Sequence, residues 1–157
     1  SWSAPGGPDA LLGLAEGDLK SIAQAGEGGS QYVTDPGELD FPLSGVTYVE
    51  LGAGGTWNPV HFGSSSGILV VHNSSTDATI KNLNSGTFRG ILIADDILHV
   101  HARIIGWVVA LTPAPSSGNC LGNGNGDILF SRQAVDDALA ATATGTDGLR
   151  LVSVKER

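Results

Sequence analysis

Five glycines along the chain each lead into a short, nearly all-apolar run. They are Gly45, Gly67, Gly90, Gly106 and Gly126. Successive glycines lie 22, 23, 16 and 20 residues apart, which is the length of one coil in a stacked solenoid rather than of a hairpin repeat. The spacing predicts that equivalent runs stack in parallel and bury one continuous column of apolar side chains.

Shorter apolar runs lie between the main ones, at residues 78–83 and 97–105. Each coil is therefore expected to hold two or three short strands separated by turns, with Gly, Ser and Asn at corners that need positive φ. We predict a mainly β fold, a right-handed parallel β-helix, over residues 44–157. This domain is expected to end with a short helix capped by Ser131 and a half-buried strand at residues 149–154.

Residues 1–43 are predicted to be a lead-in that contains one amphipathic helix. Leu12, Leu19 and Ile22 recur at helical spacing, which predicts a helix over about residues 10–25 with Asp9 as its N-terminal cap. A short helix near each end would cover the open edges of the solenoid, which otherwise favour aggregation.

Composition excludes several classes of partner. The chain has 157 residues with 23 Gly and 15% charged residues, which suits one turn-rich domain with an uncharged interior. A net charge of −8 with scattered Lys and Arg argues against binding to nucleic acid or an anionic membrane. No run approaches the ~20 apolar residues of a membrane-spanning helix. Ser1 in place of Met predicts a processed product, from which a targeting or anchoring segment has been removed.

His99 and His101 are the first candidates for metal ligands. They lie two positions apart in an expected strand, so both rings leave one face, where His72 or Asp95 would add a third ligand. A histidine pair alone lacks the ligand count that a metal requires. A solvated strand face with alternating polar residues is the favoured interpretation.

Asp127 is the other candidate ligand. It ends a Gly- and Asn-rich stretch at residues 122–127, which is similar to calcium-binding turns of some β-helices but occurs in one copy with few oxygen ligands. A turn is the favoured interpretation. We predict no metal and no cofactor.

Paired carboxylates are present without a pattern that indicates catalysis. Asp95 and Asp96 are adjacent in an expected strand and would point to opposite faces, while Asp136 and Asp137 suit the early turns of a helix. No Gly-x-Ser-x-Gly motif accompanies the serines. The sequence therefore predicts that the chain is not an enzyme.

Trp2, Leu11 and Trp57 are the candidate interface residues. Trp2 and Leu11 lie in an N-terminal segment without a solenoid partner of its own, so they are expected to contact other copies or a separate hydrophobic helix. Trp57 lies in a loop at residues 52–63, either as an exposed anchor or packed beneath the loop, and packing is favoured.

The order of the apolar runs resembles the C-terminal ectodomain of PilX-like type IV pilus assembly and pilin-like surface proteins. The matching stretches are structural rather than catalytic and cover most of residues 40–157. They are residues 44–49, 67–71, 88–94, 104–111, 124–139 and 149–156. The chain departs from the family in two ways: the anchoring pilin helix is absent, and residues 154–156 stand where an aromatic residue is usual.

The resemblance implies an extracellular, cell-surface structural subunit of a type IV pilus or pilus-like filament. Its partners would be further copies in the filament and a separate hydrophobic helical pilin subunit. Two alternatives stay open. One is an adhesin or binding module at a pilus tip, whose loops at residues 52–63 and 112–125 contact a glycan or another surface. The other is a polysaccharide-active β-helix enzyme, which needs a groove lined by several acidic residues.

Overall fold

Residues 7–112 and 126–145 are described in a computed structural model of the chain. The elements in chain order are α1 (Pro8–Leu11), α2 (Asp18–Ala25), the 3₁₀ turn η1 (Glu27–Gly29), β1 (Gln31–Val33), the 3₁₀ turn η2 (Pro36–Glu38), β2 (Val46–Glu50), β3 (Thr56–Trp57), β4 (Val60–His72), β5 (Thr79–Ala94), β6 (Asp96–Val100), β7 (Arg103–Ala110), β8 (Asp127–Phe130) and α3 (Arg132–Gly145).

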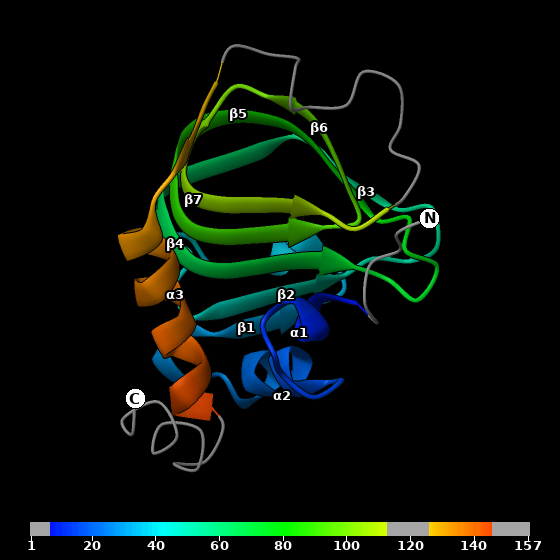
Figure 1. Ribbon diagram of the computed structural model, residues 1–157. Coiled ribbons are helices and arrows are strands. Elements are labelled where there is room, and N and C mark those ends of the chain that lie inside the picture. Colours follow the sequence, from blue (N-terminus) through cyan, green and yellow to red (C-terminus); the bar gives the residue numbers. More distant parts are fainter. Residues whose placement is uncertain (1–6, 113–125, 146–157) are drawn as a thin grey trace, which may run out of the picture.

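The eight strands of the described region form one sheet, in which neighbouring strands pair in parallel (Figure 1). The order is β1-β2-β4-β5-β7-β8, and β3 and β6 also pair with β5. The fold is therefore mainly β with short helices near both ends of the described chain, as predicted.

The glycine-led runs stack in register. Gly67 of β4 pairs with Gly90 of β5, and Gly90 pairs with Gly106 of β7. Ile68 and Ile91, which follow the first two of these glycines, are likewise paired. The prediction that these runs lie in adjacent parallel strands is confirmed.

The strands are longer than predicted, because two of them continue through a bend. The sequence predicts two or three short strands per coil, whereas β4 has 13 residues and β5 has 16 (Figure 1). Gly67 and Gly90 have φ values of +100° and +151°, which other residues rarely adopt. Each strand therefore changes direction at its glycine without leaving the hydrogen-bonded ladder.

Strand β5 pairs with different neighbours along its length, and the change of partner falls between Leu83 and Thr87, just before the bend. The first half pairs with β3 and β6, while the second half pairs with β7. Strand β4 pairs with β5 on both sides of the bend, with register shifts between Val60 and Ser64.

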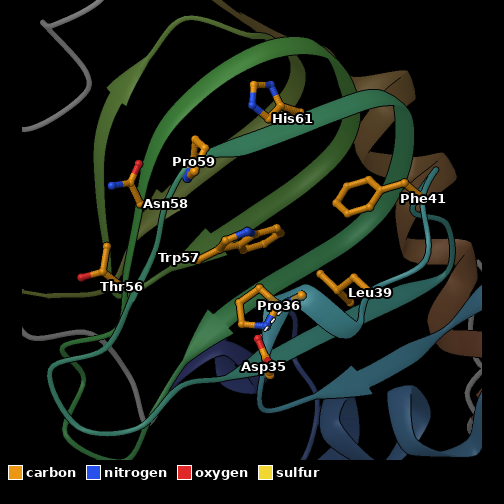
Figure 2. A pocket seen from close by; sticks show the side chains of 10 residues that line it. Asp35, Pro36, Leu39, Phe41, Thr56, Trp57, Asn58, Pro59 and His61 are labelled. Atoms are coloured by element: carbon orange, nitrogen blue, oxygen red, sulfur yellow. Dashed lines mark hydrogen bonds between the residues drawn. The ribbon is translucent and has the colours of Figure 1, made fainter.

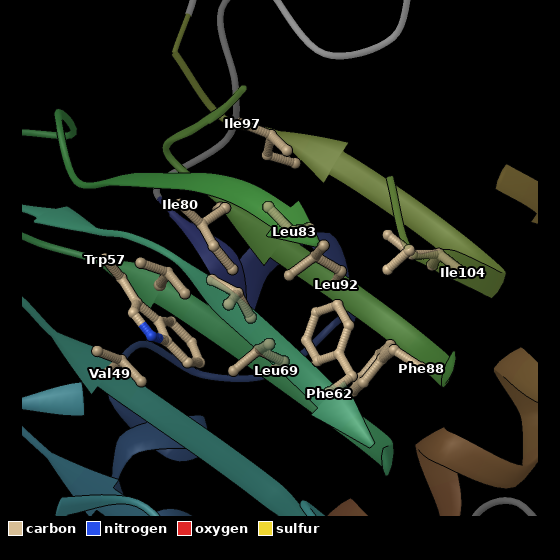
Figure 3. Close-up of a cluster of buried hydrophobic side chains, with 14 of the residues drawn as sticks. Val49, Trp57, Phe62, Leu69, Ile80, Leu83, Phe88, Leu92, Ile97 and Ile104 are labelled. Atoms are coloured by element: carbon tan, nitrogen blue, oxygen red, sulfur yellow. The ribbon is translucent and has the colours of Figure 1, made fainter. Parts of the chain in front are cut away.

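Apolar side chains form two clusters, one on each face of the straight strand segments. Successive residues of β4 point into the two clusters in turn. Leu69 and Val71 belong to one, the inner cluster, and Ile68 and Val70 to the other, the outer cluster. The inner cluster also holds side chains from the strand halves that precede the bend, among them Phe62, Ile80 and Leu83 (Figure 3). The outer cluster is closed by α2 and α3. Burial on both faces explains why these strands are continuous apolar runs.

The N-terminal region contains two helices rather than the single helix predicted over residues 10–25. Gly13 and Gly17 both have positive φ, and the chain leaves the helical path between α1 and α2. Asp9 lies inside α1 and caps the second helix, since its carboxylate accepts hydrogen bonds from the backbone N–H groups of Gly17 (3.0 Å) and Leu19 (2.8 Å). The predicted cap residue is therefore a cap, but for a helix that begins nine residues later.

The last strand pairs in a different register from the one that the glycine spacing predicts. Asp127 faces Arg103, so that Phe130 pairs with Gly106 and Gly126 lies beside Ala102. The fifth glycine is thus not equivalent to the other four. The apolar run after Gly126 forms β8. This strand pairs with the part of β7 that precedes the bend, from Arg103 to Gly106, rather than with the part that follows it.

Helix α3 follows directly and covers the outer cluster. Its N-terminus is capped as predicted, because the Ser131 hydroxyl accepts from the N–H of Ala134. Val135, Ala138 and Leu139, which share one face of the helix, pack in the outer cluster. The strand predicted at residues 149–154 lies outside the described residues. Among the described helices, none combines the length and apolar character needed to cross a membrane.

Candidate functional site

The candidate metal ligands His99, His101 and Asp127 are not gathered into a site. His99 lies in β6 with φ +57°, so the extended geometry that would align it with His101 is interrupted. His101 lies just beyond the strand and is exposed. Asp127 forms an ion pair with Arg103 at 3.1 Å. Within residues 7–112 and 126–145, no group of three His, Cys, Asp or Glu side chains is placed to hold a metal ion.

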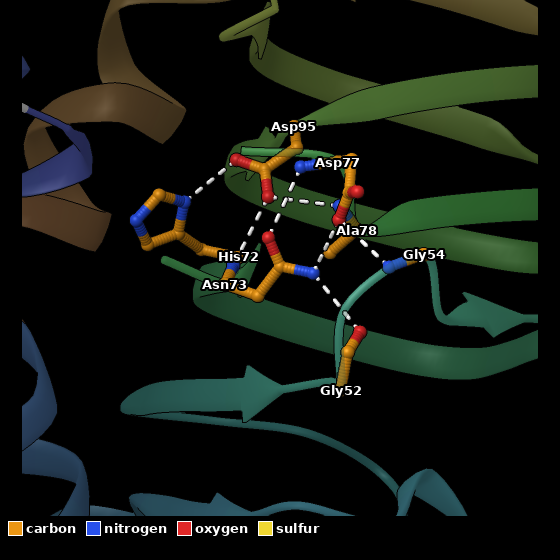
Figure 4. Close-up of polar contacts among 7 residues, drawn as sticks. All are labelled: Gly52, Gly54, His72, Asn73, Asp77, Ala78 and Asp95. Carbon is orange, nitrogen blue, oxygen red and sulfur yellow. Dashed lines mark hydrogen bonds and ion pairs between the residues drawn. The ribbon is translucent and has the colours of Figure 1, made fainter. Parts of the chain in front are cut away.

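His72 and Asp95, the two proposed third ligands, instead contact each other at a corner that we call the polar corner: Gly52, Gly54, His72, Asn73, Asp77, Ala78 and Asp95 (Figure 4). Asp95 is fully buried, and its Oδ1 lies 2.6 Å from His72 Nδ1. Its Oδ2 accepts from the backbone N–H groups of Asn73 and Ala78, each at 3.0 Å. This carboxylate therefore satisfies buried donors that would otherwise be unpaired.

Asn73 and Asp77 extend the polar corner to the preceding coil. The Asn73 amide donates to the Gly52 carbonyl and to Asp77 Oδ1, and Asp77 also accepts from the Gly54 N–H. The Gly54 N–H, followed by the Asn73 amide, lowers the pKa of Asp77. The network ties three successive turns of the chain together, which is a structural role.

The other carboxylate pairs do not share a partner. Asp96 accepts from the N–H of Ile97, whereas Asp95 faces the polar corner. Asp137 pairs with Arg89 at 2.7 Å, and Asp136 lies 3.6 Å from Arg132. Each carboxylate of the α3 pair thus bonds its own arginine.

A charged cluster joins α2 to the first strands. Glu50 lies 2.8 Å from Lys20 Nζ and accepts from the Tyr32 hydroxyl. The hydrogen bond from Lys20, then that from Tyr32, lowers the pKa of Glu50. The same bonds raise the pKa values of Lys20 and Tyr32. The cluster fastens the helix to the edge of the sheet.

An open groove with a volume of about 590 Å³ lies beside β3 (Figure 2). One wall comes from the segment around η2 and the other from β3 and the start of β4. The lining residues are Asp35, Pro36, Gly37, Leu39, Phe41, Thr56, Trp57, Asn58, Pro59 and His61. In Figure 2 the Trp57 indole lies between Pro36 and Pro59, and the Phe41 ring points toward it.

Trp57 combines the two alternatives considered from the sequence. Its side chain is 7% exposed and belongs to the inner cluster, so it packs beneath the loop as favoured, yet it also lines the groove. Sequence reasoning missed Phe41, which is 44% exposed on the opposite wall. The available signal was an aromatic residue in a turn-rich stretch, one coil before Trp57.

The remaining interface candidates are placed as follows. Leu11 is half-buried and packs against the outer cluster, and Leu14 is buried there, so the described part of the N-terminal segment does have a partner in the sheet. This corrects the expectation that the segment stands alone. Trp2 and residues 113–125 of the loop predicted at residues 112–125 lie outside the described residues. Comparisons with models of protein families, with curated proteins and with solved structures found no match.

Proposed function

We propose that the chain is an extracellular structural subunit of a type IV pilus or pilus-like filament, and that its sheet is a right-handed parallel β-helix. The observation that carries the proposal is the stacked column of Gly67, Gly90 and Gly106, with apolar runs in register behind it. Each coil adds one parallel ladder and two rows of buried side chains to the coil before it. A module of this kind is stiff, because every coil is fixed by its neighbours.

The pairing intervals support the solenoid. Val46 pairs with Ile68, Ile68 with Ile91, and Ile91 with Trp107, at separations of 22, 23 and 16 residues. The strand segments before the bend keep nearly the same intervals, as Thr79 pairs with Thr56 and Asp96. Two ladders that advance together are what a coil winding around one core produces.

An apolar strand edge supports assembly into a filament. Ile128, Leu129 and Phe130 of β8 are 38%, 48% and 70% exposed, and in the described region β8 pairs on one side only, with β7. A head-to-tail contact through such an edge produces an open filament when the rotation between copies does not close a ring. An exposed apolar edge is unfavourable in a monomer, but in a filament it would be covered by the next copy.

The proposal is tested by immunogold labelling of filaments sheared from cells that produce the chain, with the labelled mass fraction measured in parallel. A subunit should be labelled at regular intervals along the whole length. Phe130→Asp should fold, because the side chain is exposed, but should fail to enter filaments, whereas the matched control Phe41→Asp should enter them normally. Filaments free of label, or normal incorporation of Phe130→Asp, would count against the proposal.

The groove beside β3 favours a second candidate, the binding module at a pilus tip. The loop at residues 52–63, one of the two expected to contact a surface, does line a hollow of about 590 Å³. Label confined to filament ends would support this candidate over the structural subunit. The enzymatic alternative gains less, because glycoside hydrolysis needs a pair of carboxylic acids and Asp35 is the only one in the described lining of the groove.

A further inference from the structure

We infer that the groove beside β3 is a binding site for a neutral saccharide, with Phe41 and Trp57 as its apolar surface. A structural subunit and a tip adhesin could each carry such a site, so this inference is independent of the filament proposal. It rests on four properties of the groove: its aromatic walls, its polar atoms, its charge and its size.

The walls present flat apolar surface to a ligand. Phe41 is 44% exposed, Trp57 lines the groove with 7% of its surface exposed, and Pro36 and Pro59 flank the indole (Figure 2). Sugar rings carry C–H groups that pack against aromatic and proline faces. Phe41 is the exposed large hydrophobic side chain of the described lining, whereas Trp57 and Leu39 are buried, so Phe41 is the side chain best placed to act as the anchor of the site.

Polar side chains around these rings keep hydrogen-bonding capacity while their orientation is fixed. Asn58 uses its Oδ1 to accept from Asn82 (2.8 Å), which leaves its amide hydrogens for a ligand. His61 uses Nδ1 with Ser85 (2.9 Å), which leaves Nε2. Asp35 uses Oδ1 to accept from the Gly37 N–H (2.9 Å), which leaves Oδ2. Donors and acceptors held in this way need little reorganisation on binding.

This combination selects the class of ligand. Among the described residues of the lining there is no Lys or Arg, and Asp35 is present, so phosphate, sulfate and carboxylate ligands are disfavoured in a chain of net charge −8. A purely apolar ligand would leave the Asn58 amide and Asp35 Oδ2 unpaired. A neutral molecule with hydroxyl groups around an apolar ring satisfies both surfaces. The volume of about 590 Å³ lies in the range of small-molecule sites, and its open form admits a short oligosaccharide.

The test is a titration of the folded, isotopically labelled chain with cellobiose, lactose and diacetylchitobiose, followed by amide and indole NMR shifts. We expect at least one disaccharide to give saturable shifts at the Trp57 indole and at residues 35–41 and 56–61, with a Kd on the order of 1 mM. Phe41→Ala should weaken this binding about tenfold or more. The matched control Phe130→Ala, which removes an exposed phenylalanine far along the chain, should leave it unchanged.

Three results would overturn the inference. One is the absence of saturable shifts with all three sugars, and another is equal binding by the wild type and by Phe41→Ala. The third is saturation of the same residues by a decaproline peptide but by none of the sugars, because extended proline helices also dock on aromatic grooves. None of these results would change the labelling of filaments, so failure here and failure of the filament proposal are distinguishable.

Discussion

Gly90→Ala tests the stacked glycine column directly, because the backbone of Gly67 in β4 occupies the space that the new methyl group needs. A Cβ at Gly90 would lie 1.9 Å from the Gly67 carbonyl oxygen, and real Cβ contacts are essentially never closer than 3.0 Å. The oxygen belongs to a central strand, so relief requires β4 and β5 to separate. The backbone also has φ +151°. The unfavourable φ costs about 1–2 kcal/mol and the forced displacement about 1–3 kcal/mol more, so we expect the variant to lose roughly 2–5 kcal/mol of unfolding free energy.

Urea unfolding followed by circular dichroism measures this loss, and two variants separate its causes. Gly54→Ala has positive φ (+69°) but open space around the new methyl group, so it should show the backbone cost alone, about 1 kcal/mol. Gly52→Ala has neither problem and should stay within about 0.5 kcal/mol of the wild type. If Gly90→Ala is no less stable than Gly54→Ala, the close stacking of the glycines is refuted.

Three further changes probe other contacts. Ile91→Asp places an unpaired carboxylate at a fully buried position between sheet and helices and should lower the unfolding free energy by several kcal/mol in the same urea assay, so an unchanged midpoint would contradict the assigned core. Asp95→Ala removes the acceptor for two buried backbone N–H groups and should cost about 1–3 kcal/mol per group, whereas Asp95→Asn, which keeps an oxygen, should cost less. Glu50 has a lowered pKa in the folded chain, so its stabilising contribution is complete above the ordinary glutamate range and is lost as pH falls through the folded value. Glu50→Gln should therefore flatten the acid limb of a stability-pH profile, and an unaltered limb would exclude this contribution.

The sequence predicts the parallel stacking because the stacking depends on a local signal. Gly67 and Gly90 mark the bends and the runs after them mark the rows, so their spacing translates into the pairing of Ile68 with Ile91. The same logic fails at Gly126, where a glycine begins a strand without forming a bend. Glycine alone does not distinguish these two roles. Gly67 and Gly90 adopt positive φ, whereas Gly126 does not and instead leaves room for the Ala102 carbonyl oxygen, which would lie 2.3 Å from a Cβ.

The same spacing also accounts for polar contacts between successive coils, which the sequence analysis does not predict. His72 and Asp95 are 23 residues apart, one coil, and therefore meet at the polar corner. Asn58 and Asn82 pair over 24 residues in the same way. Once the coil length is known, polar residues at that separation are expected to contact each other. For His72 and Asp95, this expectation describes the structure better than a role as metal ligands does.

The groove and the N-terminal helices were not predictable in this way. Phe41 and Trp57 are brought together by the path of irregular segments between strands, which has no periodicity to detect. Asp9 finds its partners at Gly17 and Leu19 only because the chain turns back between the helices. Tertiary packing decides both outcomes, and propensity along the chain does not record it.

Cryo-electron microscopy of filaments sheared from cells that produce the chain tests the filament proposal most directly. We expect a helical reconstruction in which every repeat contains a domain of stacked parallel strands, with the β8 edge at a contact between copies. A filament whose repeating unit lacks this domain, or contains it with β8 facing solvent, would contradict the account.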